Sequence, residues 1–149
     1  MIQKVKYSIS DLQNSSDEEL ISLVYDKATE LYLETFGESL DKADSAMSDL
    51  LATWVLESEV HNGGFDQFFH NNGLEYGYNA ANGLRRIAAD NYLSVSEKAI
   101  EVFKKQSEEY QKKRNPNFNP LDDEFYDLEG LEKRRIEYIR SNYVKFVVE

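Results

Sequence analysis

The residue types that most often carry chemistry gather in one stretch of this 149-residue chain, between Glu59 and Asn71. Both histidines, His61 and His70, lie there, and Asp66 precedes His70 by four residues, so that the two would share one face of a helix. Together with Glu59, and with Glu57, which lies just before this stretch, they could form a metal site or an acid–base cluster. A hydrolase-like enzyme would use Glu59, His61, Asp66 and His70.

The spacing of these residues argues against an enzyme. The zinc-binding pattern His-Glu-x-x-His is absent, and His61 and His70 stand nine residues apart across a turn. The chain has no cysteine, which excludes disulfides, thiolate metal sites and cysteine nucleophiles. It also has no phosphate-binding loop, Gly-x-Ser-x-Gly elbow or dinucleotide fingerprint. We therefore expect no catalytic residues, no metal and no cofactor, and the hydrolase-like enzyme stays an alternative.

A sharp turn between two helices is the element that would position these side chains. Asn62-Gly63-Gly64 should end a helix, because glycine reaches positive φ without steric cost and asparagine tolerates it. Phe65, Phe68 and Phe69 then follow at i, i+3 and i+4, which places three rings on one face of a short second helix. Asn71-Asn72-Gly73 ends that helix. Residue types alone favour a packing corner over a ligand site.

Apolar residues with helical spacing continue along the rest of the chain. They predict an all-α fold, a single-domain helical bundle of about six helices with the helix–Gly-Gly corner–short aromatic helix unit at its centre. We expect an N-terminal arm over residues 1–14 and one all-α domain over residues 15–149. The expected helices are a first one over about 17–36, a central one over 41–62, the aromatic one, one near 80–88, one from Ser94 or Ser96 to about Arg114, and a closing one from Leu128.

The charge of the chain is concentrated in one third of its length. Residues 11–59 contain thirteen acidic and two basic residues, which equals the net charge of −11, and the remaining residues are balanced. Such a surface repels nucleic acid and anionic lipid, so we expect no direct nucleic-acid or membrane binding and a basic partner instead. The N-terminus lacks the apolar core of a signal peptide and no segment could span a bilayer, which predicts a cytoplasmic protein.

The acidic residues of the first long helix and of the segment that follows it, up to residue 44, are the candidate partner-binding surface. Like charges four residues apart cost a few tenths of a kcal/mol per pair, a penalty that either binding or plain solubility could explain. The candidate residues are Glu19, Asp26, Glu30, Glu34, Glu38, Asp41 and Asp44.

The motif around the corner carries a family resemblance. Asn62-Gly63-Gly64-Phe65-x-Gln67-Phe68-Phe69-x-Asn71 is preceded by Glu59 and followed by Leu121-Asp122-Asp123-Glu124-Phe125-Tyr126 and Tyr138-Ile139-Arg140-x-Asn142. This pattern resembles the bacterial DNA mimic protein 19-like family, a domain of unknown function. The resemblance implies an all-helical fold, and it assigns the corner to the family-motif residues Glu59, Asn62, Gly63, Gly64, Phe65, Gln67, Phe68 and Asn71.

The function expected from the resemblance is protein binding. The member that gave the family its name is an acidic dimer that occupies the DNA-binding surface of a transcription factor. By that resemblance we expect an acidic protein-binding module, in its most specific form a DNA mimic that regulates transcription by binding a basic DNA-binding protein, and a homodimer. The second alternative, beside the hydrolase-like enzyme, is a structural or immunity-type interaction protein without mimicry.

Overall fold

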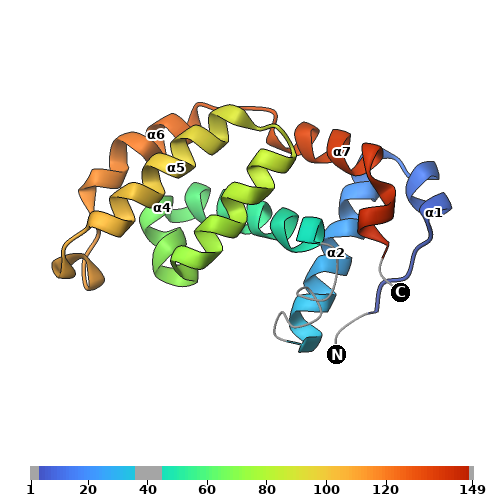
Figure 1. Ribbon diagram of the computed structural model, residues 1–149, viewed down its shortest axis with the longest axis horizontal. Helices are drawn as coiled ribbons and strands as arrows, with labels where there is room; N and C mark the ends of the chain where they lie inside the picture. The colour runs from blue at the N-terminus through green and yellow to red at the C-terminus, as the bar shows by residue number, and fades with distance from the viewer. Residues whose placement is uncertain (1–3, 36–44, 148–149) are drawn as a thin grey trace.

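The computed structural model describes residues 4–35 and 45–147, and over these residues the fold is all-helical without strands (Figure 1). The expected all-α class with about six helices is confirmed. The α-helices are α1 (Ile9–Asn14), α2 (Asp17–Thr35), α4 (Ser45–Arg86), α5 (Asp90–Lys105), α6 (Asn119–Tyr126) and α7 (Leu131–Ser141), and the 3-10 helices are η1 (Glu108–Gln111), η2 (Pro116–Phe118) and η3 (Tyr143–Phe146).

Helix α4 is the element on which the others pack. Its backbone is non-helical at Gly63, Gly64 and Gly73, so that it consists of three helical segments over about 45–62, 65–72 and 74–86. It contacts α2, α5, α6, η2 and η3. The third segment returns against the first so closely that a Cβ on Gly83 would lie 2.3 Å from the carbonyl oxygen of Asp49. The corner therefore folds α4 back on itself.

The core is richest in aromatic rings beside the corner. Phe65, Phe68 and Phe69 are all buried, as their spacing predicts. The ring of Phe69 stacks on Phe103 of α5 with 4.6 Å between centroids, and Phe65 meets Phe125 of α6 edge to face at 5.5 Å. Burial of one such side chain contributes about 1.5–3 kcal/mol. The short segment thus joins α5 and α6, which lie side by side in Figure 1.

Helix α5 differs from the expected helix at both ends. It begins at Asp90, so Ser94 and Ser96 lie inside it and cap nothing. It ends at Lys105, where Gln106 adopts an extended backbone (φ −69°, ψ 148°), although Tyr110 follows Phe103 at a helical spacing of seven residues. The expected end at Arg114 is therefore wrong, and the basic residues 112–114 do not lie at a helix C-terminus.

Residues 4–8 of the described chain have an extended backbone, and residues 9–14 form helix α1. A capping box explains the start of α1, because Ser8 Oγ accepts from the Asp11 amide and the Asp11 carboxylate accepts from the Ser8 amide. The Tyr7 hydroxyl donates to the Phe146 carbonyl, which fixes the extended segment against η3. Among the described helices none has the length and apolar character of a membrane span.

Candidate functional site

The glycine corner requires glycine at one of its two positions. Gly64 has φ 78° and ψ 179°, and a Cβ there would lie 2.3 Å from Oδ2 of Asp122. Gly63 has a negative φ of −154°, and a Cβ on it would collide mainly with the flexible side chain of Gln67. Positive φ in the corner is thus confined to Gly64, where it coincides with a close approach of α6.

Asp122 of α6 and Arg114 hold the corner from outside α4. Asp122 Oδ1 accepts from the Phe65 amide at 2.8 Å, and its Oδ2 accepts from Arg114 Nη2 at 3.0 Å. Arg114 Nη1 donates to the Gly63 carbonyl at 2.8 Å. Backbone groups that the break in α4 leaves without helical partners are satisfied in this way. Burial raises the pKa of Asp122, and the Phe65 amide and the charge of Arg114 only partly offset this effect.

Glu59 ties the two sides of the corner together on the other face. Its Oε2 accepts from Gln67 Nε2 at 2.8 Å and from Asn71 Nδ2 at 3.0 Å. All three residues belong to the expected motif. Phe65 and Phe68, two further motif residues, are fully buried, whereas Asn62 is exposed. The motif is thus a structural unit with two exposed members, Asn62 and Asn71.

The residues of the enzyme alternative do not converge on one site. Glu59 is engaged by the two amides, and the His61 ring packs against Phe125 and Tyr126, each with 5.6 Å between centroids. Asp66 and His70 line a separate cavity of about 190 Å³, and Asp66 Oδ1 accepts from the Asn115 amide. In the parts of the chain that the structure describes, no three His, Asp or Glu side chains form a group that could hold a metal ion.

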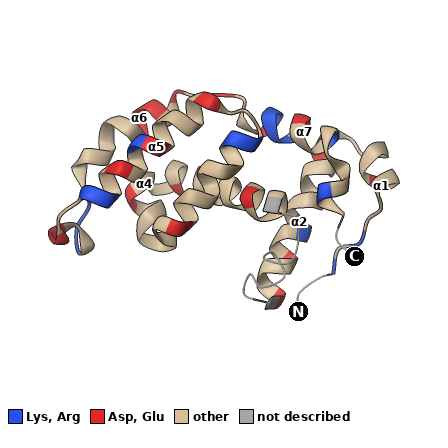
Figure 2. Ribbon diagram, in the orientation of Figure 1, with Lys and Arg blue, Asp and Glu red and all other residues tan. Residues whose placement is uncertain are grey.

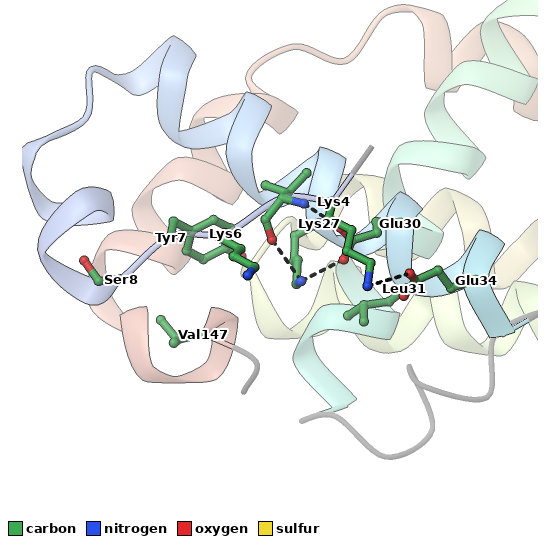
Figure 3. Close-up of a pocket in the computed structure, with 10 residues that line it drawn as sticks. Lys4, Lys6, Tyr7, Ser8, Lys27, Glu30, Leu31, Glu34 and Val147 are labelled. Atoms are coloured by element: carbon green, nitrogen blue, oxygen red, sulfur yellow. Dashed lines mark hydrogen bonds and ion pairs between the residues drawn. The ribbon is translucent and has the colours of Figure 1, made fainter. Parts of the chain in front are cut away.

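The acidic stripe on α2 is narrower than its sequence spacing predicts. Glu19, Asp26 and Glu34 are exposed, but Glu30 is only 4% exposed and is not part of the surface. Its carboxylate accepts from the Val5 amide and from Lys27 Nζ, because the N-terminal segment crosses α2 at this point (Figure 3). The last three candidates, Glu38, Asp41 and Asp44, lie outside the described residues.

The surroundings of Glu30 favour its ionised form. Burial by itself would raise its pKa, but the hydrogen bonds from Lys27 and Val5 and the charges of Lys27 and Lys4 outweigh burial and lower the pKa. Lys27 Nζ also donates to the Val5 carbonyl at 2.9 Å. Glu30 and Lys27 therefore hold the N-terminal segment on α2 and cancel one another's charge.

A groove lies between α2 and the first segment of α4, which we call the α2–α4 groove. It is open, has a volume of about 500 Å³, and is lined by Tyr25, Trp54, Glu57, Ser58, His61 and Asn62. The Tyr25 and Trp54 rings meet edge to face at 5.3 Å, and Tyr25 is 42% exposed. The exposed motif residue Asn62 thus belongs to this surface.

Arg135 of α7 forms the wall behind the groove, and sequence reasoning missed it. It is fully buried, and its guanidinium donates to Thr53, to Glu57 Oε1 at 2.8 Å and to Glu132 Oε1 at 3.0 Å. It also lies 5.3 Å from the centre of the Trp54 ring. One signal was available: Arg135 stands four residues from each of the buried residues 131 and 139, on the apolar side of α7.

Comparison with known proteins found a matching family. The family model described as DMP19-like protein matches residues 41–142, about two thirds of the chain. No match was found among curated proteins or among solved structures. The matched segment contains the corner, the Asp122 contact, Arg135 and one wall of the α2–α4 groove, whereas α2 precedes it. The chain therefore belongs to the DMP19-like protein family.

Proposed function

We propose that the protein is an acidic binding module that occupies the DNA-binding surface of a basic DNA-binding protein. The observation that supports this most directly is the exposed side of α2, where Glu19, Asp26 and Glu34 face solvent. Lys27, the one basic residue within Asp17–Thr35, is paired with the buried Glu30. The outer face of α2 therefore presents carboxylates without interleaved bases of its own, and among the described residues the base nearest to Glu34 is the exposed Lys4 of the N-terminal segment, 4.0 Å from its carboxylate (Figure 3). Membership of the family named for a DNA mimic supports the same function.

The spacing of these carboxylates suits a row of cationic side chains. At a rise of 1.5 Å per residue, Glu19 and Asp26 are separated by about 10 Å along the helix axis, and Asp26 and Glu34 by about 12 Å. Lysine and arginine side chains that contact successive phosphates of DNA can take carboxylates in their place. A partner engaged in this way would no longer be able to hold DNA at those side chains.

The described surface outside α2 carries charges of both signs. Figure 2 shows acidic and basic residues interspersed along α5 and α7, whereas α6 carries acidic residues alone. Ion pairs such as Lys113 with Glu109 and Lys98 with Glu124 neutralise part of both sets. Because the charge outside residues 11–59 is balanced, net attraction of a basic protein comes from the segment that contains α2.

Competition with DNA tests the proposal. Immobilised protein would capture partners from the host lysate at low salt, and each basic DNA-binding partner would then be titrated in the presence of labelled DNA. We expect DNA and this protein to exclude one another, with an affinity that falls steeply as salt rises. A partner that holds both at once, or capture of proteins without DNA-binding activity alone, would refute mimicry and favour the interaction protein without mimicry.

A matched pair of triple variants locates the binding face. Replacing Glu19, Asp26 and Glu34 by their amides should weaken the complex at least tenfold, about 1.4 kcal/mol, without changing the fold. The control variant carries the same loss of charge at three exposed glutamates of α5, η1 and α7, which are Glu97, Glu108 and Glu137. It should change the affinity less than threefold. Equal effects of the two triples would show that net charge, rather than α2, determines binding.

The homodimer implied by the family resemblance forms a separate part of the proposal. Sedimentation equilibrium on the full chain, at several concentrations, would give its mass directly. A monomer at all concentrations up to about 100 μM would correspond to an affinity weaker than about 5.5 kcal/mol and would remove the dimer from the proposal.

A further inference from the structure

We propose that the α2–α4 groove is a binding site for an arginine side chain of the partner, an inference that rests on the function proposed above. The groove adjoins the acidic face, since Tyr25 in its wall precedes the exposed Asp26 on α2. Three of its six lining side chains, Tyr25, Trp54 and His61, are aromatic. Aromatic residues in a pocket beside charged residues are the usual anchor points of protein interfaces.

The carboxylate of Glu57 is positioned to receive a donor from the groove. Its Oε1 accepts from Arg135 Nη1, and this is the one hydrogen bond that the described residues give it. Its side chain is 30% exposed and lines the groove, and its second oxygen accepts no hydrogen bond from the described residues. Because Arg135 fixes the carboxylate, a ligand would lose little additional side-chain entropy on binding.

The charges around the groove favour a cation. Arg135 lies behind the Trp54 ring and pairs with both Glu57 and Glu132, which leaves one negative charge in excess in this cluster. Asp26 adds another carboxylate on the adjoining face of α2. A cationic ligand is therefore complementary to the groove in charge.

The planar guanidinium group fits this arrangement better than the ammonium group of lysine. It can stack on an aromatic ring while it donates to a carboxylate, whereas the ammonium is compact and strongly hydrated. Arg135 already makes this combination from within the fold, lying over Trp54 and bonded to Glu57. A partner arginine would repeat it from the open side against Tyr25 and Glu57. Arginine is also the residue with which DNA-binding proteins most often contact phosphates and guanine, so a DNA-binding surface can supply it.

Two peptides of equal charge test the choice of arginine. Fluorescently labelled nona-arginine and nona-lysine would be titrated with the full chain and followed by anisotropy. Emission of Trp54, the sole tryptophan, would report occupation of the groove. We expect nona-arginine to bind at least fivefold more tightly than nona-lysine and to change the Trp54 emission. Equal affinities, or binding that leaves Trp54 emission unchanged, would overturn the proposal.

Variants of exposed tyrosines assign the preference to the groove. Tyr25→Ala should reduce the preference for nona-arginine to less than twofold, and Tyr25→Phe should keep it because the ring remains. Tyr78→Ala is the matched control, since Tyr78 of α4 is 43% exposed and does not line the groove. If Tyr25→Ala lowers the melting temperature, His61→Ala provides the same comparison. A full preference in Tyr25→Ala or His61→Ala would overturn the proposal.

The competition assay with DNA distinguishes an error in the proposed arginine site from an error in the proposed DNA mimicry. The amide variant of Glu19, Asp26 and Glu34 should weaken both peptides by the same factor and leave the preference for nona-arginine intact. If the partner and DNA exclude one another while both peptides bind equally, the arginine site is wrong and mimicry stands. If the preference is present but the partner holds DNA simultaneously, the groove binds arginine and mimicry is wrong.

Discussion

Replacement of Gly64 by alanine should destabilise the protein through backbone strain and through a steric clash with Asp122. A second glycine, Gly73, allows these two effects to be measured separately. Gly64 and Gly73 have nearly the same backbone, with φ 78° and ψ 179° at Gly64 and φ 81° and ψ 176° at Gly73. A Cβ on Gly64 would lie 2.3 Å from Asp122 Oδ2 and 2.8 Å from Arg114 Nη2, whereas a Cβ on Gly73 meets nothing within 4 Å. Gly73→Ala therefore measures the free-energy cost of the backbone strain alone.

The expected magnitudes follow from these contacts. Backbone of this kind, which is accessible almost only to glycine, costs a residue with a Cβ about 1–3 kcal/mol, and both variants should show this loss. Gly64→Ala must also displace a buried carboxylate from the Phe65 amide and from Arg114. Loss of hydrogen bonds to a charged group adds about 1.5–3 kcal/mol. In a chain of this size the additional loss corresponds to a melting temperature lower by about 3–12 °C.

Urea unfolding, followed by Trp54 fluorescence and by circular dichroism, would measure the free energy of unfolding of both variants. In the background of Asp122→Ala, the difference between Gly64→Ala and Gly73→Ala should largely disappear, because the displaced contact is already absent. If Gly64→Ala costs no more than Gly73→Ala in the wild-type background, the contact between α6 and the corner does not contribute as the structure indicates.

Two further predictions concern buried charges. Arg135→Met should lower the free energy of unfolding by about 3–5 kcal/mol, because Glu57 and Glu132 lose their counter-charge, and Arg135→Lys should recover less than half of this loss. Arg134→Met, at the exposed neighbouring position, is the control. A loss below about 1 kcal/mol for Arg135→Met would contradict the reasoning. Glu30 has a lowered pKa, so its stabilising contribution is complete above the ordinary glutamate pKa of 4.5 and is lost as the pH falls through the lower value of the folded state. Glu30→Gln should therefore show a shallower loss of stability in acid than the wild type, as measured by urea unfolding at a series of pH values, and parallel pH profiles would exclude this role.

The sequence predicts local parts of the site and misses parts that depend on distant residues. The corner and its three rings are signalled by residues adjacent in sequence, and the structure places them as expected. Asp122 and Arg114, which hold the corner, are 57 and 51 residues away from their backbone partners. A pattern within one helix contains no information on such pairs. The sequence pattern also does not show that Gly64, rather than Gly63, has the positive φ, since the contacts with Asp122 and Arg114 surround that position.

Burial of polar residues is the second reason for error. Glu30 has acidic neighbours on α2 and was grouped with them, but its burial results from the N-terminal segment that crosses it. Arg135 stands in a highly charged stretch and was not singled out, although it occupies an apolar position of α7. In both cases the helical periodicity was informative and the residue type was misleading, because a charged side chain can be buried once its partners are present.

The family match covers the corner but not the exposed acidic residues of α2. Residues 41–142 include the corner, the contacts that hold it and the wall of the groove formed by Trp54, Glu57 and His61. Tyr25 and the exposed acids of α2 lie before this segment. The corner fixes the direction of the first segment of α4, and α2 packs on α4, so a change on the outer face of α2 alters the binding surface without disturbing the aromatic core. Under the proposed function, the choice of partner is therefore determined mainly by α2, and the shared motif determines only that α2 has a rigid surface to pack against.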